Sequence, residues 1–465
     1  MESERAFAAR KRLRISHLFL FLSLLAGQSA AAQTVIDTVP SPADSKLNRS
    51  RGLSMLSEIK EVIKKEYYDP TFRGIAVDQR FDLAAERIKK MEANSQIFRV
   101  IAQVLLDFND SHTLFVPPPR ALRVEYGFSL QMIGADCNVV DVKKGSDAEA
   151  KGMKAGDTVL RINGYAPSRT NLGTIMYLIY QLSPQEKLNL VLRNSEGQER
   201  EVLIAAKFKT IEELIKERQR RKSEKKDTPF KCKEVSAEAI ACKLDTFSVE
   251  SSQIDKMMKE VAKYKKLILD LRGNTGGYVK TELYLTGYFF DREVKIADEV
   301  QRKKVKTRIA KSLKDKVFKG ELIVLIDSYS MSASEVFSRV IQIEKRGQIV
   351  GDVSAGAVMT SRFFVMSTSR GDWSFGKWSN FGVNVTVGDL IMSDGGRLEG
   401  VGVIPDKAIG PSASALFERD DPVLAYAASL FGVRLSPKQA HDFRFLTARY
   451  EDDEQDEDDS EDEPK

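Results

Sequence analysis

LIVLIDSYSMSASE, residues 322–335, is the stretch that decides the fold of this chain. Its first part is apolar, rich in β-branched residues and too short for a helix interior, so it predicts a buried strand that ends at Asp327. Apolar side chains at helical spacing follow over residues 336–341. Ser332 is therefore predicted to lie on a strand-to-helix turn, where the N–H groups of the new helix point toward whatever its hydroxyl attacks.

Two interpretations of this turn are open. A rigid turn at the end of a sheet is where a serine nucleophile would be placed. Ser332 and Glu335 also fit the S-x-x-E capping box that opens many ordinary helices. Taken alone, the turn favours the capping box, so the rest of the chain must supply what a nucleophile needs.

The length of 465 residues predicts two or three domains. Residues 1–32 combine a basic start, an apolar run and small residues, which predicts a secretory signal cleaved before Gln33; an uncleaved anchor is the alternative. No other stretch predicts a membrane span, so we expect an exported protein, periplasmic or extracellular. Residues 1–32 carry a surplus of three positive charges, and removing them lowers the net charge from +5 to +2.

Charge and cysteine patterns exclude several classes of function. Residues 451–465 are mostly acidic and predict a disordered solubility or interaction tail. The positive charge elsewhere has no interleaved aromatic residues, so no nucleic-acid partner is expected. Cys232 and Cys242 flank a predicted hairpin and are the best candidates for a disulfide, which would leave Cys137 free. No cysteine or histidine cluster predicts a metal, and no cofactor is expected.

Residues 33–125 predict a small helical domain. Residues 33–50 are expected to be an extended leader, and helices are expected at about 53–67, 79–91 and 95–108. The exit loop reads NDSHT at residues 109–113 and carries His112. The chain has three histidines, of which His17 lies in the signal and His441 in a polar C-terminal segment. If a serine here needs an imidazole base, His112 is the candidate; the alternative is that it only hydrogen-bonds its own loop.

Residues 126–207 are strand-rich and contain GFSL at 127–130, GSDA at 145–148 and AGDTVLRING at 155–164. The segment resembles a PDZ domain. That resemblance implies capture of an extended peptide by strand addition. The backbone N–H groups that would hold the peptide's terminal carboxylate belong to Gly127, Phe128, Ser129 and Leu130. The alternative is a module that only spaces other domains.

A charged linker helix is expected at residues 208–230, before an α/β domain at 231–412 in which strands and helices alternate. Residues 413–450 predict a helical C-terminal segment. Within the α/β domain, LDLRGNTGG at residues 269–277 places a glycine-rich turn after a buried strand. This turn lacks the Lys-Ser/Thr of a phosphate loop, and donation of an N–H to a developing oxyanion is its better use.

Five segments follow one another along the chain: the NDSHT loop, the PDZ-like segment, LDLRGNTGG, SMSASE and LEGVGVIPD (residues 398–406). In this order they resemble the tail-specific, or C-terminal-processing, serine peptidases. The resemblance covers about residues 50–430. It implies a multidomain α+β protein with an N-terminal helical domain, a PDZ-like β domain and a crotonase/ClpP-like α/β catalytic domain. It also implies that Ser332 is the nucleophile.

One departure from the family pattern is informative. Members with a Ser–Lys dyad carry a lysine where this chain has Ala357, and alanine cannot accept a proton. The tricorn-like branch of the family instead resembles this chain at Ser111 and His112, where a serine–histidine pair supplies the base. By the same resemblance Glu399 orients that base. The oxyanion donors would be the N–H groups of Gly276 or Gly277 and of Ala333.

The sequence therefore predicts an exported serine endopeptidase that cleaves peptides or unfolded, C-terminally tagged proteins. Its partners would be polypeptides, bound through their C-termini, with no integral membrane segment after signal cleavage. The alternative from another class is an inactive PDZ scaffold or carrier with a peptidase fold. A third possibility retains a displaced lysine base, Lys377. Loss of activity between about pH 6 and 7 would indicate histidine. Substrate identity and oligomeric state stay open.

Overall fold

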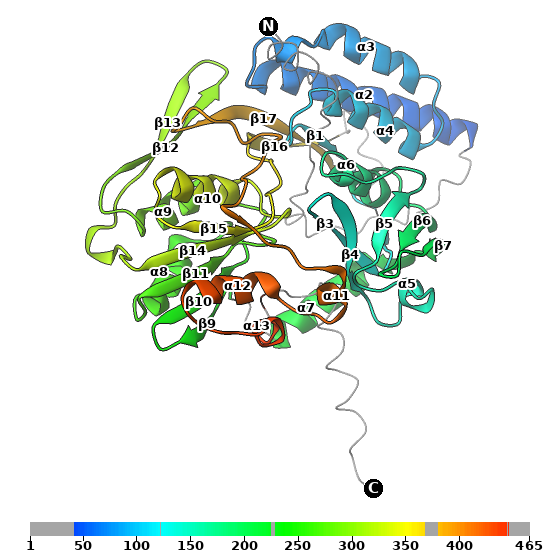
Figure 1. Cartoon of the computed structure of the whole chain (residues 1–465). Coiled ribbons are helices and arrows are strands. Elements are labelled where there is room, and N and C mark those ends of the chain that lie inside the picture. The colour runs from blue at the N-terminus through cyan, green and yellow to red at the C-terminus, as the bar shows by residue number, and fades with distance from the viewer. Residues whose placement is uncertain (1–40, 121, 225–227, 368–379, 444, 446–465) are drawn as a thin grey trace, which may run out of the picture.

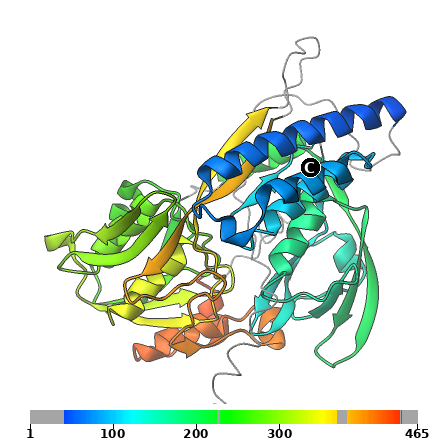
Figure 2. The same ribbon diagram turned by 90° about the horizontal axis from the view of Figure 1, so that it is seen from above.

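The computed structural model describes residues 41–120, 122–224, 228–367, 380–443 and 445. The predicted signal, the acidic tail and Lys377 lie outside these residues. Within them, no helix has the length and apolar character needed to cross a bilayer. Figure 1 shows the helical N-terminal part above two lobes, an α/β lobe and a smaller β lobe, and Figure 2 shows the same two lobes from above.

The first half of the chain supplies the N-terminal helices and the β lobe. In chain order its elements are α2 (Pro42–Glu66), η1 (Phe72–Gly74), α3 (Val77–Ile88), α4 (Asn94–Leu106), β1 (Leu114–Val116), β2 (Leu122–Glu125), β3 (Phe128–Ile133), β4 (Asp136–Val142), α5 (Asp147–Ala150), β5 (Thr158–Ile162), α6 (Leu172–Tyr177), η2 (Leu178–Leu182), β6 (Lys187–Arg193), β7 (Glu199–Ala205), β8 (Lys207–Thr210) and α7 (Ile211–Glu224).

The second half supplies the α/β lobe. Its elements are β9 (Phe230–Ser236), β10 (Ala239–Leu244), α8 (Ser251–Val261), β11 (Lys266–Asp270), α9 (Val279–Gly287), β12 (Val294–Gln301), β13 (Val305–Ala310), η3 (Lys314–Lys316), β14 (Glu321–Ile326), α10 (Ala333–Ile343), β15 (Gln348–Gly351), β16 (Thr360–Ser367), β17 (Asn380–Met392), β18 (Lys407–Ala408), α11 (Ala413–Phe417), α12 (Pro422–Leu430) and α13 (Pro437–His441).

A six-stranded sheet in the order β18-β15-β14-β11-β10-β9 forms the centre of the α/β lobe. All its neighbouring pairs are parallel except β10 and β9. β11 and β14 are almost continuously apolar because helices cover both faces of the sheet. Helices α8, α9 and α10 pack on one face, and α12 and α13 on the other, as Figure 1 shows. The strand, turn and helix around Ser332 form as predicted.

A second sheet, which the sequence reading missed, joins the N-terminal part to the α/β lobe. Its order is β1-β17-β12-β13, with β16 also paired to β17. Residues 302–319 are rich in lysine and arginine, yet they contain β13, in which Lys306 is exposed while Arg308 is buried and pairs with Glu299 of β12. In this sheet β1 pairs with β17, with Leu114 opposite Asn384. The strand that follows the NDSHT loop is thereby fixed to the α/β lobe.

The N-terminal helices begin earlier than predicted. Residues 42–50 were expected in an extended leader, but α2 starts at Pro42. The Ser41 hydroxyl accepts the Asp44 N–H, and Pro42 occupies the first helical position, where its missing N–H costs nothing. The helices do not have a core of their own, because their apolar side chains pack with Phe381, Val383 and Val385 of β17.

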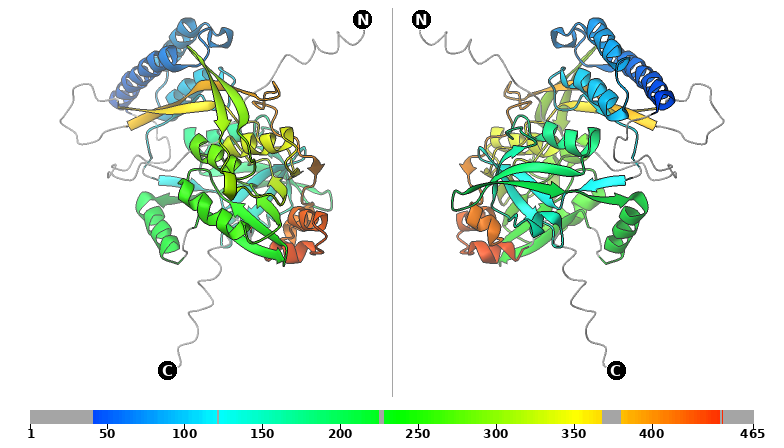
Figure 3. Two further views of the ribbon diagram at one scale, coloured as in Figure 1. Left: turned by 90° about the vertical axis from the view of Figure 1, so that its left-hand side faces the viewer. Right: turned by 90° about the vertical axis from the view of Figure 1, so that its right-hand side faces the viewer.

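The β lobe contains the sheet β3-β4-β5-β6-β7, with β3 at its edge. β2 and β8 pair where the chain enters and leaves the lobe. Charged helix α7, green in Figure 3, then lies at the periphery of the molecule. The PDZ assignment stays a prediction. The predicted disulfide between Cys232 and Cys242 is confirmed, and Cys137 is free and buried in the β lobe.

Candidate active site

Ser332 lies in a strained turn between β14 and α10. Its φ of 54° and ψ of −117° fall in a region that non-glycine residues rarely adopt. Such a residue costs about 1–3 kcal/mol and persists only where its surroundings hold it. Its N–H donates to the Ala357 carbonyl at 2.9 Å and to the Glu335 carboxylate at 3.0 Å, and its side chain stays partly exposed. The capping contact from Glu335 thus coexists with a turn that presents the hydroxyl.

Asp110, which the sequence reading did not single out, organises the NDSHT loop. Its carboxylate is buried and accepts hydrogen bonds from five donors. The donors are the Tyr67, Thr113 and Thr386 hydroxyls and the N–H groups of His112 and Thr113. Because Tyr67 directly follows α2 and Thr386 lies in β17, Asp110 holds the loop against two distant elements. The only signal in the sequence was an aspartate two residues before the histidine.

Ser111, His112 and Glu399 form a connected chain. Ser111 Oγ lies 2.6 Å from His112 Nδ1 and donates to Glu399 Oε2 at 2.9 Å. The Ser111 N–H donates to Glu399 Oε1 at 2.7 Å. Burial, together with the Asp110 charge, raises the pKa of Glu399 to about 7. Burial lowers the pKa of His112 to about 4, against the opposing attraction of Asp110. The imidazole is therefore neutral at pH 7.

Both halves of the site are attached to one short segment. Ser332 is bonded to the Ala357 carbonyl, and the next residue, Val358, donates its N–H to Glu399 Oε2 at 3.1 Å. Ala357, the predicted counterpart of the lysine in Ser–Lys dyads, contributes only backbone atoms to these bonds. Ser332 and Glu399, and through Glu399 the pair Ser111–His112, are thus linked by consecutive residues of one loop.

The glycine-rich turn lies directly beside Ser332. A Cβ built on Gly276 would come within 2.7 Å of Ser332 Cβ and 3.0 Å of Ala333 N. The N–H of Gly276, however, donates to Asn274 Oδ1 at 2.8 Å, so it is already engaged. Of the donors expected for an oxyanion, the geometry therefore favours Gly277 and Ala333, while Gly276 provides the space between them and Ser332.

The predicted peptide-binding strand, β3, contacts the segment that precedes Ser332. The Leu130 carbonyl accepts the Tyr329 hydroxyl, and the Met132 carbonyl accepts the Ser328 hydroxyl at 2.7 Å. Both carbonyls point away from β4, at the open edge of the sheet. Gly127, Phe128 and Ser129 lie at the start of this strand. A peptide that added to β3 at Leu130 would have to displace Tyr329.

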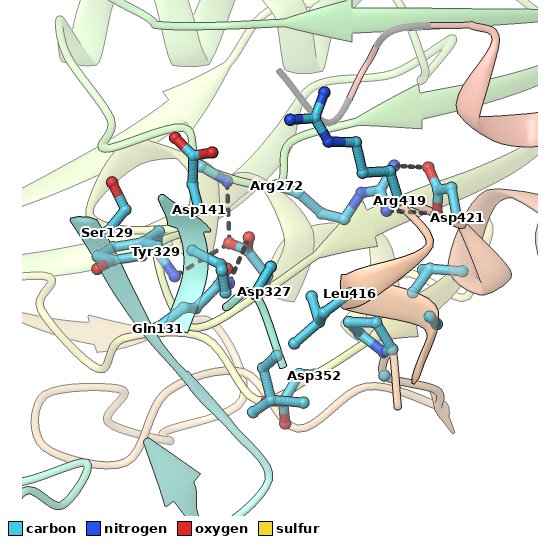
Figure 4. Close-up of a pocket in the computed structure, with 18 of the residues that line it drawn as sticks. Ser129, Gln131, Asp141, Arg272, Asp327, Tyr329, Asp352, Leu416, Arg419 and Asp421 are labelled. Atoms are coloured by element: carbon cyan, nitrogen blue, oxygen red, sulfur yellow. Dashed lines mark hydrogen bonds and ion pairs between the residues drawn. The ribbon is translucent and has the colours of Figure 1, made fainter. Parts of the chain in front are cut away.

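A cavity of about 540 Å³ separates the two lobes (Figure 4). Ser129, Gln131 and Asp141 line it from the β lobe, and Leu416 and Asp421 from the C-terminal segment opposite. Arg272 on the cavity floor makes two hydrogen bonds to Asp421, both at 2.8 Å. The cavity also reaches Thr275, next to Gly276, and Tyr329, three residues before Ser332. His441 also lines the cavity. No group of metal-ligating side chains occurs in the part of the chain that the structure describes.

Comparisons with known proteins find a peptidase family and C-terminal processing peptidases. Residues 241–409 match the model of peptidase family S41. A C-terminal processing peptidase from the chloroplast of Tetradesmus obliquus is 24% identical over 384 residues, which are 76% of this chain and 76% of the relative. The carboxy-terminal processing protease CtpA of Bacillus subtilis is 22% identical over 400 residues, 83% of this chain and 75% of the relative.

Among solved structures, mature CPAF has the same fold. It superposes with a TM-score of 0.61 at 14% identity, over 85% of this chain and 98% of the CPAF chain. At this identity the likeness concerns the fold alone. The matched family model and the C-terminal processing relatives together indicate that this chain is a serine-type peptidase, similar over residues 241–409 to peptidase family S41.

Proposed function

We propose that this peptidase is an exported serine endopeptidase that cleaves polypeptides recognised through their C-termini, with Ser332 as nucleophile and His112 as base. The observation that carries the proposal is the hydrogen-bonded chain from Glu399 through Ser111 to His112. Ser111 and Glu399 are 288 positions apart, and Glu399 also accepts the N–H of Val358, the residue after the hydrogen-bond partner of Ser332, Ala357.

The protons in this chain have one consistent arrangement. An ionised Glu399 accepts the Ser111 hydroxyl proton and two N–H groups. Ser111 Oγ then accepts Nδ1–H of His112, because its own proton is already used. The other ring nitrogen, Nε2, is left with a lone pair and can take the proton of Ser332. Protonation of Glu399 would allow the Ser111 proton to turn toward Nδ1, and the imidazole would lose this tautomer.

The reaction follows from these roles. Ser332 Oγ attacks the carbonyl carbon of the scissile peptide bond while its proton passes to His112. The resulting oxyanion accepts the N–H groups of Gly277 and Ala333, an interaction worth about 2.7–4 kcal/mol per donor. His112 then protonates the leaving amine, and an acyl-enzyme remains on Ser332. Water, deprotonated by the same imidazole, attacks the ester and regenerates the serine.

Three features support the substrate class and the location. The relatives are named for C-terminal processing. The cavity between the lobes runs from the edge of β3 to the glycine-rich turn, which suits an extended peptide. The Cys232–Cys242 disulfide and the features of residues 1–32 fit an oxidising compartment outside the cytosol. The inactive-scaffold alternative has no observation that favours it.

Substitution Glu399→Gln tests the assignment. The amide keeps the size of the side chain but offers its NH₂ group to donors, so it fails to fix the tautomer. We expect kcat on an unfolded protein substrate to fall by about 10²–10⁴-fold with KM little changed. Glu321→Gln, on the exposed end of β14, is the matched control. Unchanged kcat in Glu399→Gln, or hydrolysis that survives Ser332→Ala, would contradict the proposal.

A further inference from the structure

Glu335 accepts far more hydrogen bonds than a helix cap requires. Its carboxylate is completely buried. Oε1 accepts the Ser354 hydroxyl at 2.6 Å and the Gly356 N–H at 2.6 Å. Oε2 accepts the Ala357 N–H at 2.8 Å and the Ser332 N–H at 3.0 Å. A capping contact accounts for the last of these bonds, and the other three go to the loop that faces the nucleophile.

The loop of residues 354–358 has no regular structure to hold it in place. Gly356 is left-handed, with φ of +71°, and Ala357 has no side chain long enough to reach Ser332. Ser354 is anchored on its far side, where its hydroxyl accepts the Val403 N–H at 2.6 Å. The contacts that hold the 354–358 loop against the Ser332 turn are backbone hydrogen bonds and the hydrogen bonds to the Glu335 carboxylate. Without that carboxylate, two buried N–H groups of the loop would lose their acceptor.

The same loop ends in Val358, which donates to Glu399. Glu335 therefore lies between the backbone of Ser332 on one side and the support of the imidazole on the other. A shift of the loop changes the distance between these two halves. Reacting groups must be held within fractions of an ångström, and a misplacement of about 1 Å can cost 10²-fold in rate.

We propose that Glu335 is a positioning residue for peptide hydrolysis, holding the Ser332 turn and the 354–358 loop in one fixed arrangement. This inference rests on the proposed roles of Ser332 and His112. Glu335 touches neither substrate nor reacting atoms, and it acts through the backbone of the two segments. Only the ionised carboxylate can accept all four bonds, and burial raises the pKa of Glu335 to about 7, so the arrangement weakens in mild acid.

The test compares Glu335→Gln with Glu282→Gln. Glu282 is buried to the same extent in the same lobe, and its hydrogen-bond partner is Thr286 of its own helix. In each full-length variant, kcat and KM on a peptide and the rate of Ser332 modification by a fluorophosphonate are measured, with thermal unfolding as a check on folding. We expect Glu335→Gln to lower kcat and the modification rate by about 10²-fold with KM within twofold. Glu282→Gln should stay within twofold of the parent in all three.

Each outcome bears on one of the two proposals. A folded Glu335→Gln protein whose kcat and modification rate match those of the parent overturns the positioning role. An equal loss of kcat and modification rate in Glu282→Gln also overturns it, because the effect would then follow from neutralising any buried carboxylate in this lobe. If the parent itself is not modified at Ser332, the proposed function fails instead. Should Glu335→Gln not fold, Glu335→Asp, which keeps the charge on a shorter side chain, is expected to lose about tenfold in kcat at unchanged KM; parental kcat would again overturn the inference.

Discussion

Two carboxylates, Glu335 and Glu399, support the two halves of the proposed active site, the Ser332 turn and the Ser111–His112 pair, in different ways. Glu335 holds the nucleophile's half, and all its donors lie within 22 positions in the same lobe. Glu399 holds the base's half, and its donor Ser111 is 288 positions away. Burial raises the pKa of both side chains to about 7.

The two halves therefore depend on different parts of the fold. The Ser332 turn is built by a strand, a turn and a helix that are contiguous in sequence. The His112 loop exists only where β1 pairs with β17 and Asp110 reaches Tyr67 and Thr386. Local substitutions should therefore damage the nucleophile's half without unfolding the protein. Damage to the base's half should also change how the N-terminal helices attach.

Gly276→Ala is expected to have the largest effect on the nucleophile's half. The added methyl group would lie 2.7 Å from Ser332 Cβ and fill the space in front of the Ala333 N–H. We expect kcat to fall by at least 10²–10³-fold, the loss typical of an oxyanion donor. Gly395→Ala, also at positive φ but with no atom within 4 Å, controls for backbone strain. Equal kcat in the two variants would show that the glycine-rich turn does not serve the reaction.

The pH dependence of kcat should separate the carboxylates from the histidine. Activity needs both Glu399 and Glu335 ionised, and each protonation lowers kcat about tenfold per pH unit, so kcat should fall by up to about 100-fold per pH unit as the pH drops below about 7. The sequence reading assigned a loss at pH 6–7 to histidine, but burial lowers the pKa of His112 to about 4, which moves its own titration out of that range. If kcat fell only near pH 4 and not near pH 7, the assignment of the pH dependence to Glu399 and Glu335 would be contradicted.

Stability should change with pH in the opposite direction. Three carboxyls, Glu282, Glu335 and Glu399, have a pKa raised by burial to about 7, so the stability they contribute is present below about pH 4.5 and is lost as the pH rises through 7. His112, with its lowered pKa, acts the other way, and three groups outweigh one. Between pH 5 and 7 the free energy of unfolding should thus fall while kcat rises. Urea unfolding between pH 5 and 7 measures the free energy of unfolding. If this free energy rose together with kcat over that range, the prediction would be contradicted.

Asp110→Asn tests the base's half. The amide keeps one oxygen but replaces the other with an NH₂ group, so part of the five-donor set loses its acceptor. We expect a loss of about 1–3 kcal/mol in the free energy of unfolding and roughly tenfold in kcat. Tyr67→Phe, which removes a single donor, should lose about 1 kcal/mol. Full stability in Asp110→Asn would mean that the loop is held by other contacts.

Tyr329→Phe should have the smallest effect and concerns the edge of β3. Removing the hydroxyl frees the Leu130 carbonyl for an incoming peptide strand. In a Ser332→Ala background, a fluorescent peptide with a free C-terminus should bind a few-fold more tightly, as measured by anisotropy. An amidated peptide of the same sequence is the control. Weaker or unchanged binding would indicate that peptides do not add to β3.

Much of the nucleophile's half could be predicted because its signals are local. The apolar strand, the strained serine and the new helix follow one another in residues 322–343, and the structure has them there. The support of the base could not be predicted from the residues alone. It depends on β17, whose pairing with β1 joins residues 266 to 270 positions apart, and on Asp110, two of whose partners, Tyr67 and Thr386, are distant in sequence. The engaged N–H of Gly276 likewise depends on a side-chain rotamer of Asn274.

The central claim is that an imidazole from the N-terminal part activates a hydroxyl in the α/β lobe. Its most direct test is the rate at which a fluorophosphonate modifies Ser332 in the parent and in His112→Ala, with the labelled peptide identified by mass spectrometry. We expect modification at Ser332 in the parent and a loss of at least 10³-fold in rate in His112→Ala. Modification at another residue, or an undiminished rate in His112→Ala, would contradict it.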